Sequence, residues 1–371
     1  MNKKILAGVF TLSGAVIGAG ILGLPFSFSK SGYLVGSFWL IFFGAIILYT
    51  NLCLGEVVLR TKGNHQLAGY AKRYLGDGGR NLMLFAVIFG IYSALLAYLI
   101  GEGESLSKLF GGGIDPVILG FLFWIVMTFL LRNGLEGLKK VETYGVVGII
   151  IIVCVIFFWF IPQIDISNLA TINFDKLTFS VGIIIFALLG FTSIPEIGRE
   201  LKGSEKRVKK VILYGSLIPI ILYFIFTATF VGVLGGDVTE IATVSFGSGI
   251  VILGIFTMFT SYFVLSFSLK NTFTYDLGMN QKSAFFFSSV IPLVIYLLVS
   301  FFGLLSFTLV LGIGGVISGG VTGILILVMN RKVKSEIKDL RKPEYIVPIS
   351  WLVVILLSVI FTLGIVFEFL R

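Results

Sequence analysis

Long apolar segments follow one another along the chain, and only short polar stretches separate them. A helix needs about 20 apolar residues to cross the ~30 Å hydrocarbon core of a bilayer. Eleven segments approach or exceed that length: residues 5–29, 34–58, 82–101, 116–131, 143–161, 178–198, 211–234, 248–269, 283–302, 305–329 and 346–369. The pattern therefore predicts an all-α polytopic membrane protein with 11 transmembrane helices in a single transporter-sized domain, residues 1–371.

The composition agrees with this class of protein. The chain is 57% hydrophobic and 13% charged, whereas soluble domains have roughly 45–50% apolar and about 25% charged residues. Cys53 and Cys154 lie within apolar segments, where cysteine behaves as a small hydrophobic residue. The one histidine, His65, lies in a polar loop and cannot build a metal site alone. No cluster of His, Asp or paired polar residues at membrane depth points to an enzyme.

The positions of Lys and Arg predict the orientation. A net charge of +9 would suggest a nucleic-acid partner for a soluble protein, but loops of membrane proteins carry excess Lys and Arg on the cytoplasmic side. With the N-terminus in the cytoplasm, all 28 basic residues fall on that side except Lys30, Lys108, Lys176 and Arg371. The opposite loops carry Glu102, Glu104, Asp115, Asp165, Asp175, Asp237 and Glu240. We therefore expect a multi-pass cell-membrane protein that contacts lipid, has an extracytoplasmic C-terminus, and needs neither nucleic acid nor an obligate protein partner.

The first apolar segment contains residues that weaken helices. The stretch "GAVIGAGILGLPFSF", residues 14–28, holds four glycines and Pro25. Glycine permits unusual dihedrals and proline removes a helical hydrogen bond. In lipid, freed backbone groups survive only where they line a protein cavity. Close helix packing through Gly14 and Gly18 is the alternative, since their spacing suits it.

The sixth apolar segment also contains glycine followed by proline. In "FALLGFTSIPEIG", residues 186–198, Gly190 precedes Pro195 by five residues, as Gly20 precedes Pro25. The two segments cross the membrane in opposite directions, because the sixth segment comes five spans after the first and five is an odd number. Interrupted helices at corresponding positions of two opposed halves are typical of inverted-repeat secondary transporters. The predicted first repeat covers residues 5–161, the second 178–330, and an additional helix 346–370.

Three stretches carry a family resemblance. "GAVIGAGILGLPFSFSKSGY" and "FALLGFTSIPEI" resemble the first and sixth helices of the amino acid–polyamine–organocation superfamily. Within it, the chain is most similar to the amino acid/auxin permeases and the bacterial tryptophan/tyrosine permeases. "TSYFVLSFSLKNTFTYDLG", residues 260–278, resembles their eighth helix and the loop after it. The resemblance implies the leucine-transporter fold with a 5+5 inverted repeat, discontinuous helices one and six, and substrate bound between them.

Helix ends inside the membrane suggest what the breaks bind. A helix start offers free N–H groups and a partial positive charge, and a helix end offers carbonyls and a partial negative charge. We therefore predict that the amides of Gly18, Ala19 and Gly20 bind the carboxylate of an amino acid. Carbonyls of both breaks, those of Val16, Ile17, Phe186 and Leu189, would accept its ammonium group. The predicted substrate-binding residues are Val16, Ile17, Gly18, Ala19, Gly20, Tyr92, Phe186, Ala187, Leu188, Leu189 and Gly190.

The side-chain pocket is predicted to be apolar and partly aromatic. Glu56 and Glu196 are the only acids within spans away from the outer ends, and both lie toward the cytoplasmic side. No carboxylate therefore meets a cationic substrate at mid-depth, which favours a neutral apolar or aromatic amino acid. The expected wall consists of Phe186, Leu188 and Leu189, with Tyr92, Leu96 and Phe256. With 37 Phe in the chain, packing or lipid contact is the alternative for any one aromatic residue.

Acidic residues within spans also suggest a gate, because ionisable groups in membranes are usually functional or paired. We predict that Glu56, Glu196 and Arg199 form a cytoplasmic gate with Phe186, which matches the gating aromatic residue of the resembled family. The spacing of Glu196 and Arg199 allows a local ion pair. Simple proximity to the aqueous edge is the alternative for both acids.

Hydroxyl groups in the eighth segment suggest a coupling ion. Thr257, Thr260 and Ser261 share one helical face. The resemblance implies a sodium site in which Thr260 and Ser261 join carbonyls of Ser13 and Val16. Some proton-coupled relatives carry a lysine on helix five, which "YGVVGIIIIVCVIFF" lacks. Sodium is thus favoured over a proton as the coupling ion, and no other cofactor is expected. Hydroxyls that bond back to their own helix are the alternative.

Two other classes of protein share the resembled fold. An amino acid sensor or interaction scaffold commonly has long cytosolic extensions, whereas about four residues precede the first apolar segment. Metal-ion transporters place an acid and Asn at the first break and Met or His at the sixth. Neither Gly18-Ala19-Gly20 nor Ala187-Leu188-Leu189 supplies these groups. We therefore expect a transporter of a neutral, apolar or aromatic amino acid, with a sensor or interaction scaffold as the alternative.

Overall fold

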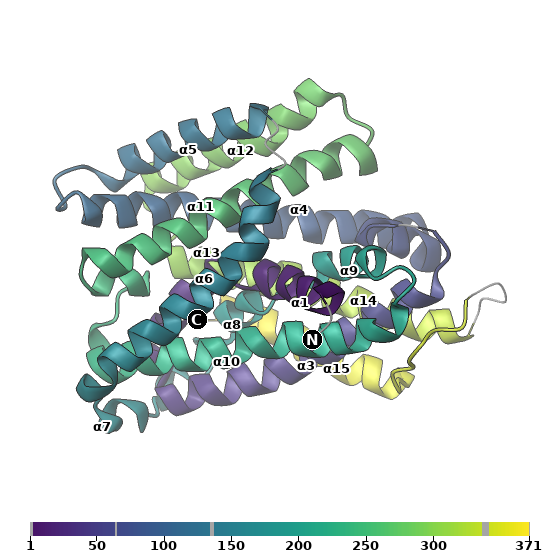
Figure 1. Ribbon diagram of the computed structural model, residues 1–371, viewed down its shortest axis with the longest axis horizontal. Coiled ribbons are helices and arrows are strands. Elements are labelled where there is room, and N and C mark those ends of the chain that lie inside the picture. Colours follow the sequence, from purple (N-terminus) through teal and green to yellow (C-terminus); the bar gives the residue numbers. More distant parts are fainter. Residues whose placement is uncertain (1–2, 64, 134–136, 336–340, 371) are drawn as a thin grey trace.

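The computed structural model describes residues 3–63, 65–133, 137–335 and 341–370, and these ranges contain helices but no strand. Figure 1 shows most of the long helices running side by side. Within the described ranges, nine helices are long and apolar enough to cross a membrane, or ten if one bent pair is a single span. A further apolar helix, Pro116–Arg132, is shorter. The molecule is therefore a multi-pass membrane protein.

The principal helices follow the predicted segments in order. Their bounds are α1 Lys3–Val16, α2 Gly20–Ser31, α3 Tyr33–Arg60, α4 Leu67–Leu109, α5 Pro116–Asn133, α6 Gly137–Phe160, α7 Ile166–Leu169, α8 Val181–Ala187, α9 Ile194–Glu200, α10 Val208–Leu234, α11 Ser248–Asn271, α12 Gln281–Phe302, α13 Phe307–Gly314, α14 Gly320–Ser335 and α15 Trp351–Phe369.

Two differences from the predicted segments are informative. Helix α4 begins at Leu67 rather than at residue 82, because a helical stretch before Gly76 precedes the predicted span. The two parts of α4 meet at a kink at Gly76, whose φ of 75° and ψ of −167° are not helical and suit glycine. Glu102, assigned above to an acidic loop, lies within α4 and is completely buried. Hydropathy placed it at a polar boundary, but the helix extends further and turns its carboxylate into the protein.

The first and sixth apolar segments are interrupted. Helix α1 ends at Val16, α2 begins at Gly20, and the two are bent by 54°. Helix α8 ends at Ala187 and α9 begins at Ile194, with a short 3₁₀ turn, Phe191–Ser193, between them. The prolines do not make the breaks: Pro25 lies inside α2, and Pro195 lies in the first turn of α9, where the missing N–H costs little.

The interrupted helices lie at the centre of the bundle. In Figure 1, α1 and α8 lie between α4, α11 and α13 on one side and α3 and α10 on the other. Helix α2 packs against both α8 and α10. A Cβ atom on Gly20 would be only 2.5 Å from the Cα of Ala187, so the two breaks approach closely enough to require glycine. Freed backbone is thereby enclosed by protein, as lipid demands.

Apolar side chains cover the periphery. On α5, α6, α12 and α15, large apolar residues point outward, including Phe129, Phe158, Phe301 and Leu352. Such a surface would aggregate in water. It suits a hydrocarbon environment and agrees with the multi-pass assignment.

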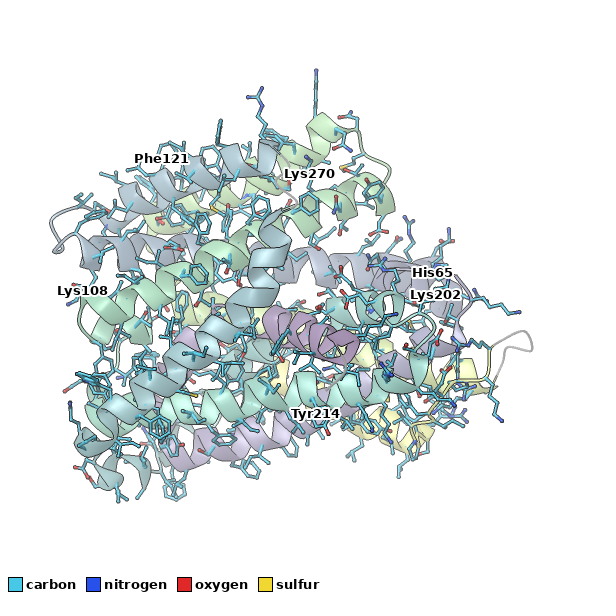
Figure 2. All side chains as sticks on the ribbon, viewed as in Figure 1. His65, Lys108, Phe121, Lys202, Tyr214 and Lys270 are labelled. Carbon is cyan, nitrogen blue, oxygen red and sulfur yellow. The ribbon has the colours of Figure 1, made fainter. Side chains whose placement is uncertain are left out.

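Loops of opposite charge lie at opposite ends of the bundle. The backbone N–H of Arg341 donates to the carbonyl of Arg60 (3.0 Å), and its guanidinium pairs with Glu205 (3.5 Å), so these three segments meet at one end. We name this the basic end. His65 and Lys202 lie there, whereas Lys108 lies at the far side, the acidic end (Figure 2). Lys338, counted above, lies outside the described residues, as do the side chains of Lys3, Lys139 and Lys140.

A buried carboxylate holds the basic end together. Glu56 of α3 is completely buried and pairs with Arg60 (2.8 Å) and with Lys334 of α14 (3.0 Å). It also accepts hydrogen bonds from Asn330 Nδ2 (3.2 Å) and from the backbone N–H of Val347 (2.9 Å). One side chain thus ties α3 to α14 and to the segment that leads into α15.

Replacing this carboxylate is expected to destabilise the protein. Glu56→Ala leaves two largely buried cations without their carboxylate, which should lower the free energy of unfolding by about 3–5 kcal/mol. Asp77→Ala is the matched control, because Asp77 and Lys72 form an exposed pair (3.7 Å) worth at most about 1 kcal/mol. Thermal unfolding of the purified protein measures both. Equal losses in the two variants would contradict this account of Glu56.

Candidate functional site

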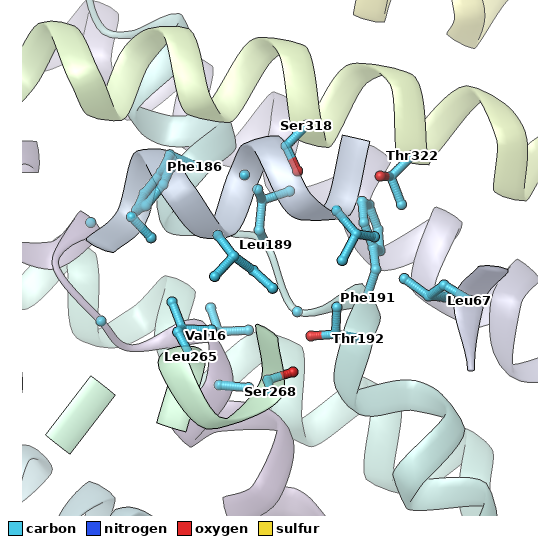
Figure 3. A pocket seen from close by; sticks show the side chains of 18 of the residues that line it. Val16, Leu67, Phe186, Leu189, Phe191, Thr192, Leu265, Ser268, Ser318 and Thr322 are labelled. Atoms are coloured by element: carbon cyan, nitrogen blue, oxygen red, sulfur yellow. The ribbon is translucent and has the colours of Figure 1, made fainter. Parts of the chain in front are cut away.

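A cavity of about 110 Å³ lies where the two breaks meet. Figure 3 shows Val16 of the first break facing Phe186 and Leu189 of the second across it. The breaks contribute Val16, Gly18, Gly20, Phe186, Leu189 and Gly190 to its wall. The two breaks also touch, since a Cβ on Gly190 would be 2.6 Å from a methyl group of Val16.

Some backbone groups of the first break form hydrogen bonds with one another. The N–H of Gly18 donates to the carbonyl of Val16 (3.1 Å). The N–H groups of Ile21 and Leu22 turn back to the carbonyls of Gly18 (3.4 Å) and Ala19 (3.0 Å). Of the three amides predicted to bind a carboxylate, that of Gly18 is therefore used internally. Gly20 opens α2 beside the cavity, where the first N–H groups of a helix lack helical partners.

A tyrosine from a third helix joins the two breaks. The hydroxyl of Tyr223 on α10 lies 2.9 Å from the carbonyl oxygen of Val16 and 2.8 Å from that of Ala187. Its side chain is completely buried. These carbonyls close α1 and α8, so the hydroxyl satisfies backbone acceptors that the helices themselves leave open. The sequence analysis did not find Tyr223, because nothing in an apolar segment marks contacts with residues 207 and 36 positions away.

Several predicted pocket residues lie elsewhere. The hydroxyl of Tyr92 donates to the carbonyl of Phe287 on α12 (2.9 Å), so this side chain points away from the cavity. Leu96 is buried in the core, and Phe256 is 42% exposed on the periphery. Ile17, Ala19, Ala187 and Leu188 are buried beside the breaks without lining the cavity.

Helix α4 presents a different face from the predicted one. Val87, Ile91, Ala94 and Tyr98 line the cavity, and their spacing of three or four residues defines one helical stripe. The hydroxyl of Tyr98 lies so close to the first break that a Cβ on Gly18 would be 2.7 Å from it. The stripe is readable in the sequence once one of its members is known. Tyr92 and Leu96, which were predicted to line the pocket, lie on a neighbouring face of α4.

The cavity wall is uncharged. Besides apolar groups and the phenol of Tyr98, the described lining residues contribute the aliphatic hydroxyls of Thr192, Ser268, Ser318 and Thr322, and none is Asp, Glu, Lys, Arg or His. Figure 3 shows these four side chains around the same space as Leu189. Thr322 Oγ1 is buried without a hydrogen-bond partner in the described part of the chain. A ligand here would meet peptide dipoles, an aromatic ring, aliphatic carbon and hydroxyl groups.

The cavity extends toward the basic end. Its lining continues from the breaks to Leu67 at the start of α4 and to Ser268 near the end of α11. In the opposite direction, Tyr98 is the last α4 residue in the wall. The structure thus has its cavity on the basic-end side of the breaks and packed protein on the acidic-end side.

The residues of the predicted sodium site lie near the first break, and most already have partners. Thr257 Oγ1 donates to the carbonyl of Leu253 (2.7 Å), and Thr260 Oγ1 lies 3.1 Å from the carbonyls of Phe256 and Thr257. These hydroxyls bond to their own helix, which was the predicted alternative to a sodium site. Ser13 Oγ donates to Gly215 (3.1 Å). Ser261 Oγ lies 3.7 Å from where a Cβ on Gly18 would be, so α11 and the first break do meet.

The predicted gate residues do not form one cluster. Phe186 is half-buried in the cavity wall, while Glu56 lies in the network at the basic end. Glu196 and Arg199 are exposed, and no ion pair joins them among those of the described residues. The spacing allowed a pair, but exposed side chains lose little by remaining in water.

Comparisons with known proteins give a family and a fold. The sequence model of the tryptophan/tyrosine permease family matches residues 1–367. The tyrosine-specific transport system 1 of Haemophilus influenzae is 25% identical over 236 residues, 63% of this chain and 59% of that protein, so the match spans less than two thirds of that relative. Glutamine transporter 2 of Aliivibrio fischeri is 24% identical over 322 residues, 79% of this chain and 81% of that protein.

A solved structure supports the fold alone. A variant of the manganese transporter of Eremococcus coleocola superposes with a TM-score of 0.65 at 13% identity, covering 98% of this chain and 87% of that one. At such low identity the likeness concerns the arrangement of helices and carries no statement about substrate.

The close contact of the breaks can be tested with a single methyl group. Gly20→Ala places its Cβ 2.5 Å from backbone of Ala187, so the helices must separate. We expect the free energy of unfolding to fall by about 1–3 kcal/mol. Gly148→Ala in α6 is the control, because nothing lies within 4 Å of its Cβ. Thermal unfolding measures both variants. A Gly20→Ala protein as stable as the control would show that the breaks do not pack as described.

Proposed function

We propose that this chain, which belongs to the tryptophan/tyrosine permease family, is a secondary active transporter that carries a neutral amino acid across the cell membrane. Members of the family are permeases, so the protein is a membrane transport protein and not an enzyme. The observation that carries the proposal is the uncharged cavity at the meeting point of two interrupted helices.

Helix ends are suited to the two charges that all amino acids share. Gly20 starts α2 at the cavity and supplies the positive end of a helix dipole. Val16 and Ala187 end α1 and α8 and supply the negative ends. A carboxylate at α2 and an ammonium group near the carbonyls of Val16, Ile17, Phe186 and Leu189 would satisfy both. Ala19 completes the predicted carboxylate cradle, whereas Gly18 would first have to release Val16.

The wall of the cavity favours a neutral side chain. Phe186, Leu189 and Tyr98 offer apolar and aromatic contacts, and the four hydroxyls offer hydrogen bonds to a polar tip. The relatives named above are a tyrosine-specific system and a glutamine transporter, both for neutral amino acids. We propose an apolar or aromatic substrate. Metal transport fits poorly, since no lining residue is Asp, Glu, His or Cys in the described cavity.

The proposed architecture is a 5+5 inverted repeat of the leucine-transporter type. Residues 5–161 and 178–330 would form the repeats, with 346–370 as an eleventh helix outside them. Interruptions in α1/α2 and in α8/α9, one in each half, support this arrangement. The N-terminus and the basic end would face the cytoplasm, in accord with the positive-inside rule.

In alternating access, the acidic end would open while the basic end packs, and the reverse. The cavity would thus be reached from one end at a time. The present cavity continues toward the basic end, so with that end in the cytoplasm this conformation would correspond to the cytoplasm-facing state. Glu56, Glu196 and Arg199 would act at the cytoplasmic side, with Phe186 closing over the substrate. A sensor or interaction scaffold without net transport is the alternative, and it would bind the same ligand in the same cavity.

We further propose that an ion gradient drives uptake, with sodium favoured over a proton. One charge that moves through 100 mV supplies about 2.3 kcal/mol. Thr260 and Ser261 of α11, together with carbonyls of Ser13 and Val16, would hold the ion, with Thr257 beside them. The support is the contact between Ser261 and the first break. The hydroxyls would exchange their present backbone bonds for the cation.

The transport function is testable in reconstituted vesicles. Vesicles containing the protein should take up labelled L-tyrosine about ten times as fast as protein-free vesicles. A tenfold ratio corresponds to about 1.4 kcal/mol of free energy. Unlabelled L-tryptophan and L-glutamine should compete, and L-arginine should not, because the described wall lacks a carboxylate. Binding without uptake would favour the sensor. Equal competition by L-arginine would contradict the proposed substrate class.

The sodium site has its own test. Thr260→Ala and Ser261→Ala each remove one oxygen ligand and should raise the half-saturating sodium concentration about tenfold, a loss of about 1.4 kcal/mol. Ser266→Ala on the same helix is the control, because it lies outside the proposed site. Initial rates of uptake against sodium concentration measure all three. Undiminished uptake in sodium-free buffer would rule out sodium coupling.

A further inference from the structure

One buried acid has no role in the site described above. Glu102 of α4 is 0% exposed, and neither oxygen of its carboxyl group has a hydrogen-bond partner in the described part of the chain. No ion pair joins it to any described Lys or Arg. An isolated ionised carboxylate in such surroundings is so unfavourable that the group takes up a proton instead. Glu102 in this conformation is therefore a neutral carboxylic acid.

Its surroundings contain other polar groups without partners. Ser105 lies one helical turn further along α4, and its buried Oγ also lacks a partner in the described residues. The same holds for Thr243 Oγ1 in the short 3₁₀ helix Ala242–Ser245, which packs against α2, α4 and α11. Buried polar groups normally have a partner or an ordered water. Glu102, Ser105 and Thr243 are thus three buried polar groups toward the acidic end whose side-chain oxygens lack a partner among the described residues.

The position of Glu102 relates it to the transport cavity. Tyr98 lies four residues earlier on the same helical face and is the last α4 residue of the cavity wall. Four residues correspond to about 6 Å along the helix axis. Glu102 therefore lies just beyond the cavity, in the packed protein that separates it from the acidic end.

The charged and titratable groups on neighbouring elements leave Glu102 without a counter-ion. Basic residues on α5, α11, α12 and α14 lie at the other ends of those helices. The groups at the same end are Tyr98, Glu104 and Lys108 on α4, Asp115 before α5, Tyr262 on α11, Tyr296 on α12 and Glu240 before Ala242–Ser245. None of them is a hydrogen-bond partner of Glu102. Lys108, the one cation among them, is exposed.

We propose that Glu102 is a proton-binding site of the transport cycle: the acidic end can close only after this carboxylate has taken up a proton from the solution on that side. The proposal rests on the proposed transport function. When the acidic end opens, water reaches Glu102 and the proton can leave to that solution. When it closes, one proton must return, because the packed region offers no other partner for the charge. The rate of closure therefore depends on pH even if sodium supplies the driving force.

The test uses the neutral isostere of the protonated acid. Exchange of labelled for unlabelled L-tyrosine is measured in vesicles with equal pH on both sides, from pH 5.5 to 9. In the wild type, the exchange rate should fall as the pH rises, approaching about tenfold per pH unit for a single required proton. Glu102→Gln should exchange at a rate that changes less than about twofold over the range, because it cannot lose a proton. Asp237→Asn, the same loss of a carboxylate at an exposed acid of the acidic end, should behave as the wild type.

A second measurement does not depend on transport. Glu102→Gln should be at least as thermally stable as the wild type at pH 7, since it replaces a neutral group by a neutral group. As the pH rises from 5 to 9, the melting temperature of the wild type should fall relative to that of Glu102→Gln. The folded state holds a proton on Glu102 that the unfolded chain releases above about pH 4.3, so higher pH favours the unfolded chain.

The outcomes separate the two proposals. A Glu102→Gln protein that keeps the pH profile of the wild type, or that unfolds at a much lower temperature, would overturn the role of Glu102. A wild-type protein that exchanges no amino acid would instead overturn the transport function, and the pH-dependent melting temperatures would still decide whether Glu102 is a neutral acid in the folded protein.

Discussion

The structure depends on one constraint: a peptide group released from a helix inside the membrane must find a partner within the protein. Helices α1/α2 and α8/α9 release such groups at the same depth, and each break provides part of the enclosure of the other. Gly20 brings α2 against the backbone of Ala187, and Gly190 brings the second break against Val16. Tyr223 then brings a hydroxyl donor from a third helix to a carbonyl of each break. The cavity is the space that remains between them.

Because peptide dipoles supply its polarity, the cavity needs no charged side chain. This separates the chemistry of the site from the arrangement of helices around it. The manganese transporter of Eremococcus coleocola shares the arrangement, yet the described wall here has hydroxyls and hydrocarbon rather than metal ligands. Charged side chains are found instead at the basic end, where Glu56 gathers Arg60 and Lys334. The polarity of the cavity and the cohesion of the basic end are thus supplied by different kinds of group.

The sequence predicted where the helix breaks lie along the chain better than it predicted which way side chains point. Gly20 and Gly190 marked both breaks, since paired glycines in opposed halves weaken two helices where lipid penalises free backbone. Apolar windows do not say which way a side chain points, so Tyr92 was placed in a cavity that Tyr98 lines. Tyr223 could not be found, because its partners lie far away in the chain. Glu102 was assigned to a loop because a charge at the edge of an apolar run indicates a boundary. The ion coupling and the repeat boundaries remain predictions.

A phenol has a single hydrogen, and Tyr223 faces two acceptors with it. At any instant the hydroxyl can serve the carbonyl of Val16 or that of Ala187, and the other oxygen keeps a lone pair without a donor. The N–H of Gly18 also donates to Val16, so Ala187 is the carbonyl that loses this donor when the hydroxyl turns to Val16. An incoming ammonium group, with three hydrogens to give, would end this competition by donating to that carbonyl.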